Sequence, residues 1–304
     1  MKNKTNSILL AIASCLLWST AFAGIKIGLE YSSPLAFAGT RFFISGLLIL
    51  PFTCKPVKYI RTVKDNYGIL LLLALTQTFL NYALFYSGMD LVPGAVGAVI
   101  IGVQPLIIAV IASLMIRNEP FTKKRTATLI AGIAGVVFVS MGRQSLDLGQ
   151  ELEIIGIFLL LGVNFTSGFS NIIVSKYGKK INPLVLSSFS LLVGGLALFL
   201  ISIPMEGYNS FRQPLEYWAS LGWLSFMSAA AFSLWYTALH IPGVKVSDLN
   251  LWKFIIPVLG AILSWIVLPG EQPDWITITG MIIISTSLFF FFKRKPRENR
   301  ISNK

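Results

Sequence analysis

The sequence contains few charged residues, two cysteines and a single histidine. Only 12% of its 304 residues are charged, while 55% are hydrophobic; soluble domains carry about 25% charged residues. Such a chain cannot cover itself with polar surface, so we expect lipid to solvate most of it. The scarcity of cysteine and histidine argues against a disulfide framework or a metal cluster, and we expect no cofactor.

Long apolar stretches account for most of the chain. Each is close to the roughly 20 residues that a helix needs to cross a bilayer, and none alternates in the manner of a strand, so we predict an all-α integral membrane protein with ten transmembrane helices. The predicted spans are residues 7–29, 34–54, 68–89, 93–117, 124–141, 152–175, 182–204, 214–239, 244–268 and 273–292.

Basic residues gather between alternate spans. With the N-terminus inside, most Lys and Arg residues fall on the inner side, and only Arg143 and Arg212 fall on the outer side. This bias predicts cytoplasmic termini, a basic tail at residues 293–304 and a place in the cell (inner) membrane. The net charge of +12 then reflects inner loops and not a nucleic-acid partner. Ala21-Phe22-Ala23 imitates a signal-peptide cleavage site, but its apolar run is long enough to span.

The chain repeats itself. Pro105 is followed by Glu119 fourteen positions later, and Pro257 is followed by Glu271 at the same distance. Five spans per copy is an odd number, so the second copy crosses the membrane upside down, as in many alternating-access carriers. We therefore predict one membrane domain made of two inverted five-helix repeats, residues 5–143 and 150–292, around a central cavity.

The repeated prolines and glutamates allow two interpretations each. Pro105 and Pro257 are expected to kink their helices, either for gating or only for packing. Glu119 and Glu271 follow helix ends and are expected to be structural, either pairing with Lys123 or capping the following helix near Pro120 or Pro273.

These motifs resemble the EamA-type branch of the drug/metabolite transporter superfamily. The matching pieces are Leu16-Leu17-Trp18-Ser19, Ser33-Pro34-Leu35 through Arg41-Phe42, Gln104-Pro105 through Glu119-Pro120, Trp235-Tyr236-Thr237-Ala238-Leu239, and Ile256-Pro257 through Gly270-Glu271. The resemblance implies ten helices, a central cavity and export of amino acids or other metabolites. The sequence departs from the symmetric pattern at Ser190, which stands where the first half has Arg41.

Polar side chains within spans are costly and are candidates for the site. Lys253 is expected either to bind an anionic group of the substrate or to pair with Asp248. Arg41 is expected to guide an anionic group or to snorkel to the surface. Lys26 is expected to snorkel.

Amides and aromatic residues complete the candidate substrate-binding set. Two amide pairs recur on single helix faces and either line the cavity or bond between helices, namely Gln77 with Asn81 and Asn164 with Asn171. Aromatic residues form cavity walls or interface belts; the candidates for walls are Trp18, Trp235, Tyr236 and Trp252, of which Trp18 and Trp252 are expected to lie deepest. Trp235 is not included in the candidate substrate-binding set.

Three classes of function compete. A membrane enzyme needs a nucleophile with a base or a cluster of acids or histidines, and the sequence contains no HExxH, GxSxG or P-loop motif. A channel usually builds rings of like residues from symmetric subunits. We therefore predict a secondary transporter of small metabolites (amino acids, related zwitterions or organic anions) acting by alternating access, more as an exporter than as an importer or exchanger. Its expected partners are the substrate and the bilayer, with the protein as a monomer, or else a dimer.

Overall fold

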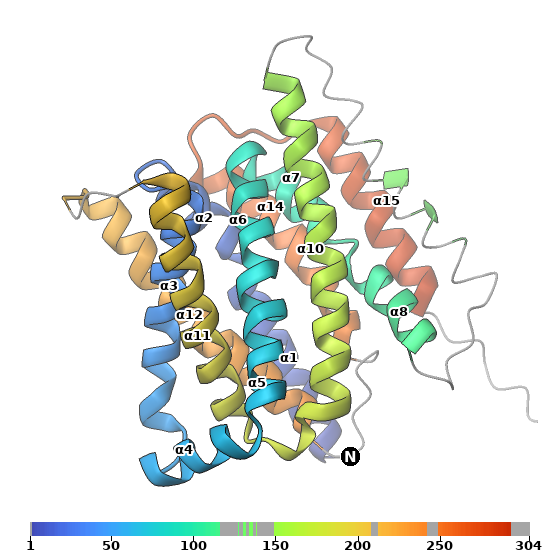
Figure 1. Cartoon of the computed structure of the whole chain (residues 1–304). Helices are drawn as coiled ribbons and strands as arrows, with labels where there is room; N and C mark the ends of the chain where they lie inside the picture. The colour runs from blue at the N-terminus through green and yellow to red at the C-terminus, as the bar shows by residue number, and fades with distance from the viewer. Residues whose placement is uncertain are drawn as a thin grey trace, which may run out of the picture.

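The computed structural model is a bundle of helices (Figure 1). It describes residues 2–115, 127, 130, 131, 134, 135, 138, 149–207, 212–241 and 249–292, and no strand occurs within these ranges. Five of the described helical segments are long and apolar enough to cross a membrane, namely Thr5–Leu29, Pro34–Phe52, Tyr67–Leu91, Glu151–Val174 and Pro183–Glu206. Most of the predicted span 124–141 and the tail 293–304 lie outside the described residues, so the count of ten remains a prediction.

The first half supplies helices α1 to α8. Their bounds are α1 (Lys2–Ser19), α2 (Ala21–Leu29), α3 (Pro34–Ile49), a 3-10 turn (Leu50–Phe52), α4 (Pro56–Asp65), α5 (Tyr67–Leu73), a π-helical segment (Ala74–Leu80), α6 (Asn81–Leu91), α7 (Gly94–Ile101) and α8 (Gln104–Met115).

The second half supplies helices α10 to α15. Their bounds are α10 (Gly149–Tyr177), a 3-10 turn (Gly178–Lys180), α11 (Pro183–Glu206), α12 (Leu215–His240), the 3-10 segment η4 (Leu251–Phe254), α14 (Ile255–Val267) and α15 (Trp275–Phe292). With 26 residues, α12 is about 39 Å long, which is enough to cross a bilayer.

Helices of the two halves pack in pairs. The main partners are α3 with α11, α1 with α12, α6 with α10 and α7 with α14. Glycines allow the closest of these contacts: a side chain at Gly39 would collide with the backbone of Phe199, and one at Gly195 with the backbone of Phe43. Small residues at helix crossings are the usual means of close packing in membranes.

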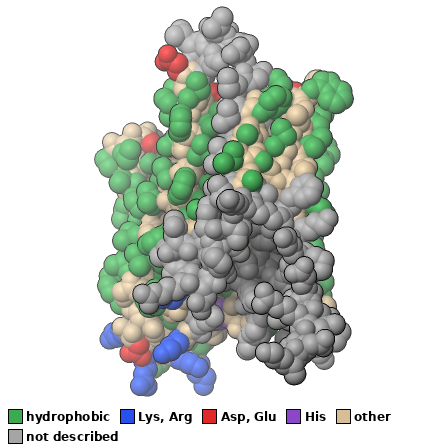
Figure 2. Space-filling view, turned by 90° about the vertical axis from the view of Figure 1, so that its right-hand side faces the viewer, with side chains coloured by type: hydrophobic (Ala, Val, Ile, Leu, Met, Phe, Trp, Pro, Cys, Tyr) green, Lys and Arg blue, Asp and Glu red, His purple; other side chains and the backbone are tan. Residues whose placement is uncertain are grey.

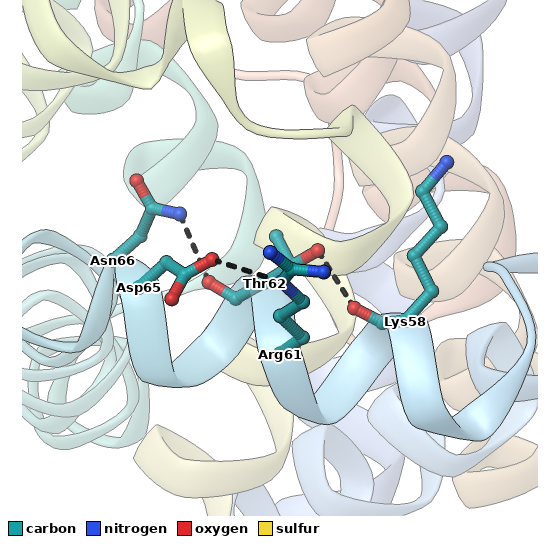
Figure 3. Close-up of polar contacts among 5 residues, drawn as sticks. All are labelled: Lys58, Arg61, Thr62, Asp65 and Asn66. Atoms are coloured by element: carbon teal, nitrogen blue, oxygen red, sulfur yellow. Dashed lines mark hydrogen bonds and ion pairs between the residues drawn. The ribbon is translucent and has the colours of Figure 1, made fainter.

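Helix α4 lies across one end of the bundle (Figure 1). It is fastened to α11 by the Tyr59 hydroxyl, 3.1 Å from Ser188 Oγ. Its outward face carries Lys58 and Arg61, and Arg61 pairs with Asp65 at 3.9 Å (Figure 3). Figure 2 shows hydrophobic side chains over the left and upper parts of one face, Lys and Arg gathered at its lower left, and Asp and Glu mainly at its upper end.

The helix breaks differ from the predicted proline kinks. The chain leaves the α-helical path at Gly102 and Val103, and Pro105 is the second residue of the new helix α8. Pro257 likewise lies in the first turn of α14, directly after the 3-10 segment η4. The prediction of mid-helix kinks was therefore wrong, because proline is best tolerated in a first turn, where its missing N–H removes no helical hydrogen bond.

The two breaks meet. A side chain at Gly102 would lie 2.9 Å from Cβ and Cγ of Pro257, so only glycine admits the proline ring at this crossing. The irregular segments of the two halves thus face each other inside the bundle, which is where broken helices can expose polar backbone groups to a cavity.

Candidate functional site

A cavity of about 100 Å³ lies where the two halves face each other. That is room for roughly seven to ten water molecules, or for a small organic molecule of similar size. Its walls come from α1, α2, α3, α6, α7, α8 and the π-helical segment in the first half, and from α10, α12, η4 and α14 in the second. Aromatic rings and a few polar groups share the lining, as expected of a site for a small ligand.

Lys253 lies in η4 and is 7% exposed. Its ammonium group donates a 2.9 Å hydrogen bond to Gln104 Oε1. The same nitrogen lies 4.7 Å from the ring centre of Trp235 and 5.7 Å from that of Trp18. Aromatic faces attract cations, so the lysine is held by one amide and two rings. Asp248, the alternative partner, lies outside the described residues.

Arg41 is also buried, with 2% of its side chain exposed, so the snorkelling alternative was wrong. Its guanidinium donates to Ser228 Oγ from Nε at 3.1 Å and from Nη2 at 2.7 Å. It also donates to the Leu224 carbonyl oxygen at 3.3 Å and to the Tyr86 hydroxyl. These neutral acceptors fix the guanidinium at the cavity wall without neutralising it.

Three predicted amides line the same cavity. Gln77 lies in the π-helical segment and Asn81 directly follows it; π-helical turns are frequent at functional sites. Asn81 Oδ1 accepts 2.7 Å hydrogen bonds from Thr166 and Ser167, and Asn171 Nδ2 donates to the Ser167 carbonyl at 2.8 Å. Asn81 and Asn171 therefore both line the cavity; Asn81 also joins α6 to α10, whereas the bond of Asn171 stays within α10.

Two predicted site residues lie elsewhere. Trp252 is half-buried and does not belong to the cavity lining, although its neighbour Lys253 does. Asn164 is fully buried outside the lining, and its Nδ2 donates to the Ile100 carbonyl at 3.1 Å. Because Ile100 lies in the last turn of α7, beside the break, the hydrogen bond of Asn164 stabilises this end of α7. Ser190, in the place symmetric to Arg41, bonds to Thr78 Oγ1 at 2.8 Å.

Several lining residues were missed. Trp235 is 2% exposed and lines the cavity with Trp18, Phe232 and Tyr236, although its place near a span end favoured an interface belt. Gln104 was noticed only as part of the motif with Pro105; an amide beside a proline inside an apolar run was the available signal.

At the end of the bundle opposite α4, two carboxylates cap the N-termini of helices. Glu271 accepts hydrogen bonds from the backbone N–H groups of Gly94 and Ala95 at 2.6 and 3.0 Å. Glu271 therefore caps α7, in the other half of the chain. The expected cap on its own following helix, near Pro273, was wrong. Lys26 is half-buried, and its ammonium donates hydrogen bonds to the carbonyls of Met89 at 3.1 Å and Asp90 at 3.4 Å, at the end of α6.

Glu206 acts in the same way as Glu271. It accepts from the N–H groups of Leu35 and Ala36 at 2.8 and 3.0 Å and so caps α3. Both glutamates place a negative charge at the positive end of a helix dipole, and both connect the second half of the chain to the first.

Comparisons with known proteins agree with this architecture. The model of the EamA-like transporter family matches the chain twice, over residues 5–141 and 154–293. A solved structure titled only as the crystal structure of a protein superposes with a TM-score of 0.69 at 17% identity, covering 94% of this chain and 96% of the other. At that identity it shows the fold alone.

The relatives are named as transporters. The uncharacterized transporter YvbV of Bacillus subtilis is 26% identical over 94% of this chain and 91% of its own. A protein of Salmonella typhimurium named "Probable amino-acid metabolite efflux pump" is 26% identical over 96% of this chain and 97% of its own. Since the family model covers both halves of the chain, this protein belongs to the EamA-like transporter family and is a multi-pass membrane transporter, not an enzyme.

Proposed function

We propose that this chain is a ten-helix carrier that moves small metabolites through the membrane by alternating access, as an exporter. The observation that carries the proposal is a cavity with walls from both halves and several polar side chains in its lining. A site at the interface of inverted repeats can open to either side when one half rocks against the other.

Two further observations support the inverted arrangement. The family model matches once in each half. Helix α3 of the second predicted span packs on α11 of the seventh, its counterpart in the other half, and α7 of the fourth packs on α14 of the ninth. The first span packs on the eighth (α1 with α12), and the equivalent contact between the sixth and the third (α10 with α6) is also present. A pairing that survives this exchange is what a two-fold axis in the membrane plane produces.

The proposed orientation places both termini and α4 in the cytoplasm, with the protein in the cell membrane. The cations at the α4 end and the acids at the other end (Figure 2) favour this direction by the positive-inside rule. Reporter tags at either terminus test it: both tags outside the cell would overturn the orientation, and tags on opposite sides of the membrane would overturn the span count. We further propose a monomer, because one chain encloses the cavity; the mass of the detergent complex by light scattering tests this.

Transport is tested with purified protein in liposomes loaded with mixtures of amino acids and small organic acids. The proposal predicts saturable efflux of at least one class, absent from empty liposomes. Flux that rises linearly with concentration would indicate a channel, and chemical change of the solute would indicate an enzyme.

The meeting of the two breaks offers a sharper test. Gly102→Ala places a methyl group against Pro257, so we expect it to reduce flux at least about tenfold if the breaks move during transport. Gly222→Ala is the matched control, since nothing lies within 4 Å of a side chain at that position. Equal flux by both variants would show that the contact of Gly102 with Pro257 does not change during transport.

A further inference from the structure

Both cations of the cavity are held by neutral groups only. Within the described residues, Lys253 bonds to an amide and Arg41 to hydroxyls and a carbonyl, and no described acid lines the cavity. The ion pair of Arg61 with Asp65 lies away from the cavity, on α4. Buried charges are costly unless they are compensated, and the described lining of the cavity has excess positive charge.

The aromatic walls cannot serve as an ammonium site. The faces of Trp18 and Trp235 are the natural places to hold a cationic ligand group by cation–π attraction. Both already lie within 6 Å of the Lys253 nitrogen. A ligand ammonium placed there would meet the positive charge of Lys253, with no described carboxylate in the lining to offset the repulsion.

Hydrogen-bond donors remain for an anion. The Tyr236 hydroxyl is buried without a hydrogen-bond partner among the described residues and belongs to the lining. A buried hydroxyl that lacks a partner is costly, and a carboxylate oxygen is an acceptor that satisfies it. Gln77 and Asn81 also line the cavity, and the nitrogen of each amide can donate a hydrogen bond to a carboxylate oxygen.

We propose that the cargo is a small organic monoanion, one carboxylate on an apolar body without an amino group, whose negative charge offsets part of the positive charge of Lys253 and Arg41. This inference rests on the proposed carrier function and narrows it: zwitterionic amino acids are disfavoured. The carboxylate lies between the cations and the Tyr236 hydroxyl, and the apolar body packs against Phe232 and the tryptophans.

We call the proposed preference for monoanions over zwitterions, cations and neutral molecules the charge rule. Four probes that share the leucine carbon skeleton test it: 4-methylpentanoate (anion), leucine (zwitterion), leucinamide (cation) and 4-methylpentanamide (neutral). Their Kd values are measured on the purified full-length protein by tryptophan fluorescence and by calorimetry. We expect the anion to bind at least tenfold more tightly than each of the other three. Leucine binding as tightly as 4-methylpentanoate, or an anion Kd above about 10 mM, would overturn the proposal.

Variants separate charge from folding. Lys253→Met is expected to abolish the preference for the anion over the neutral amide, and Lys253→Arg to keep it; melting temperatures without ligand report whether each variant is folded. Lys58→Met, the same substitution on exposed α4, and Asp248→Asn are the controls and should leave the anion Kd unchanged. If Lys253→Met is folded and keeps the preference, or if Asp248→Asn changes the Kd, the proposal is wrong.

The binding and flux measurements test the charge preference and the carrier function separately. Anion-selective binding without flux in liposomes would contradict the carrier function and leave the charge rule intact. Flux of leucine in preference to 4-methylpentanoate would support a carrier and overturn the charge rule.

Discussion

Arg41 owes its position to the fork of its guanidinium. Three groups on two other helices, Ser228, Leu224 and Tyr86, accept its hydrogen bonds. A lysine presents a single nitrogen and cannot reach all three. Arg41→Lys is therefore expected to lose about 1–3 kcal/mol of stability through acceptors left unpaired, measured as a lower melting temperature in detergent. An unchanged melting temperature would show that the fork does not hold the helices together.

Asn164 stabilises the break between α7 and α8. Its amide satisfies the Ile100 carbonyl, and membrane-buried hydrogen bonds of this kind contribute about 0.6–1.7 kcal/mol. We expect Asn164→Ala to lower the melting temperature without changing the Kd of a cavity ligand. The control is Asn66→Ala, which removes only a local hydrogen bond to the Thr62 carbonyl outside the membrane helices. A changed Kd of the cavity ligand in Asn164→Ala would show that Asn164 takes part in ligand binding.

Sequence reasoning identified the polar residues of the cavity better than the aromatic ones. Residues such as Gln77 and Lys253 stand out because a polar group inside an apolar span is costly. Trp252 was expected to lie deeper than Trp235, but the cavity lining includes Trp235 and not Trp252. Depth along a span was counted from its ends, whereas the face of each helix depends on its neighbours: α12 packs on α1, which turns Trp235 toward Trp18 at 5.4 Å between ring centres.

At the scale of the helices, two glutamates fasten the end opposite α4. Glu271→Gln keeps an acceptor but removes the charge from the N-terminus of α7. We expect a loss of about 1 kcal/mol, again read as a melting temperature, and a similar loss for Glu206→Gln. The matched control is Glu30→Gln, whose side chain is exposed. Equal melting temperatures for Glu271→Gln and Glu30→Gln would contradict the capping role.

The helix ends followed from the sequence only in part. Pro34 and Pro183 open α3 and α11 as their place after a polar residue predicts. The breaks before Pro105 and Pro257 were expected as kinks, because a sequence shows where proline disrupts a helix but not how the backbone rearranges. The π-helical segment at Ala74–Leu80 leaves no recognisable pattern, and Glu271 bonds to a helix 176 residues away in the chain, which spacing cannot reveal.

At the scale of the molecule, the cavity belongs to neither half alone. Arg41 and Gln77 come from the first half, and Lys253 and Trp235 from the second. The repeat of Pro and Glu at equal spacing indicates two related halves from the sequence alone. It does not indicate which helices pair, because pairing depends on close contacts such as that of Gly39 with Phe199.

The central claim is that this cavity opens to each side of the membrane in turn. The chain contains only Cys15 and Cys54 as native cysteines, so Cys15→Ala and Cys54→Ser give a cysteine-free background for Gln77→Cys. A membrane-impermeant thiol reagent is applied to right-side-out and to inside-out vesicles, with Asn164→Cys as the control outside the lining. We predict that position 77 reacts from both sides and position 164 from neither. Reaction of position 77 from one side only, with or without cargo, would contradict the claim.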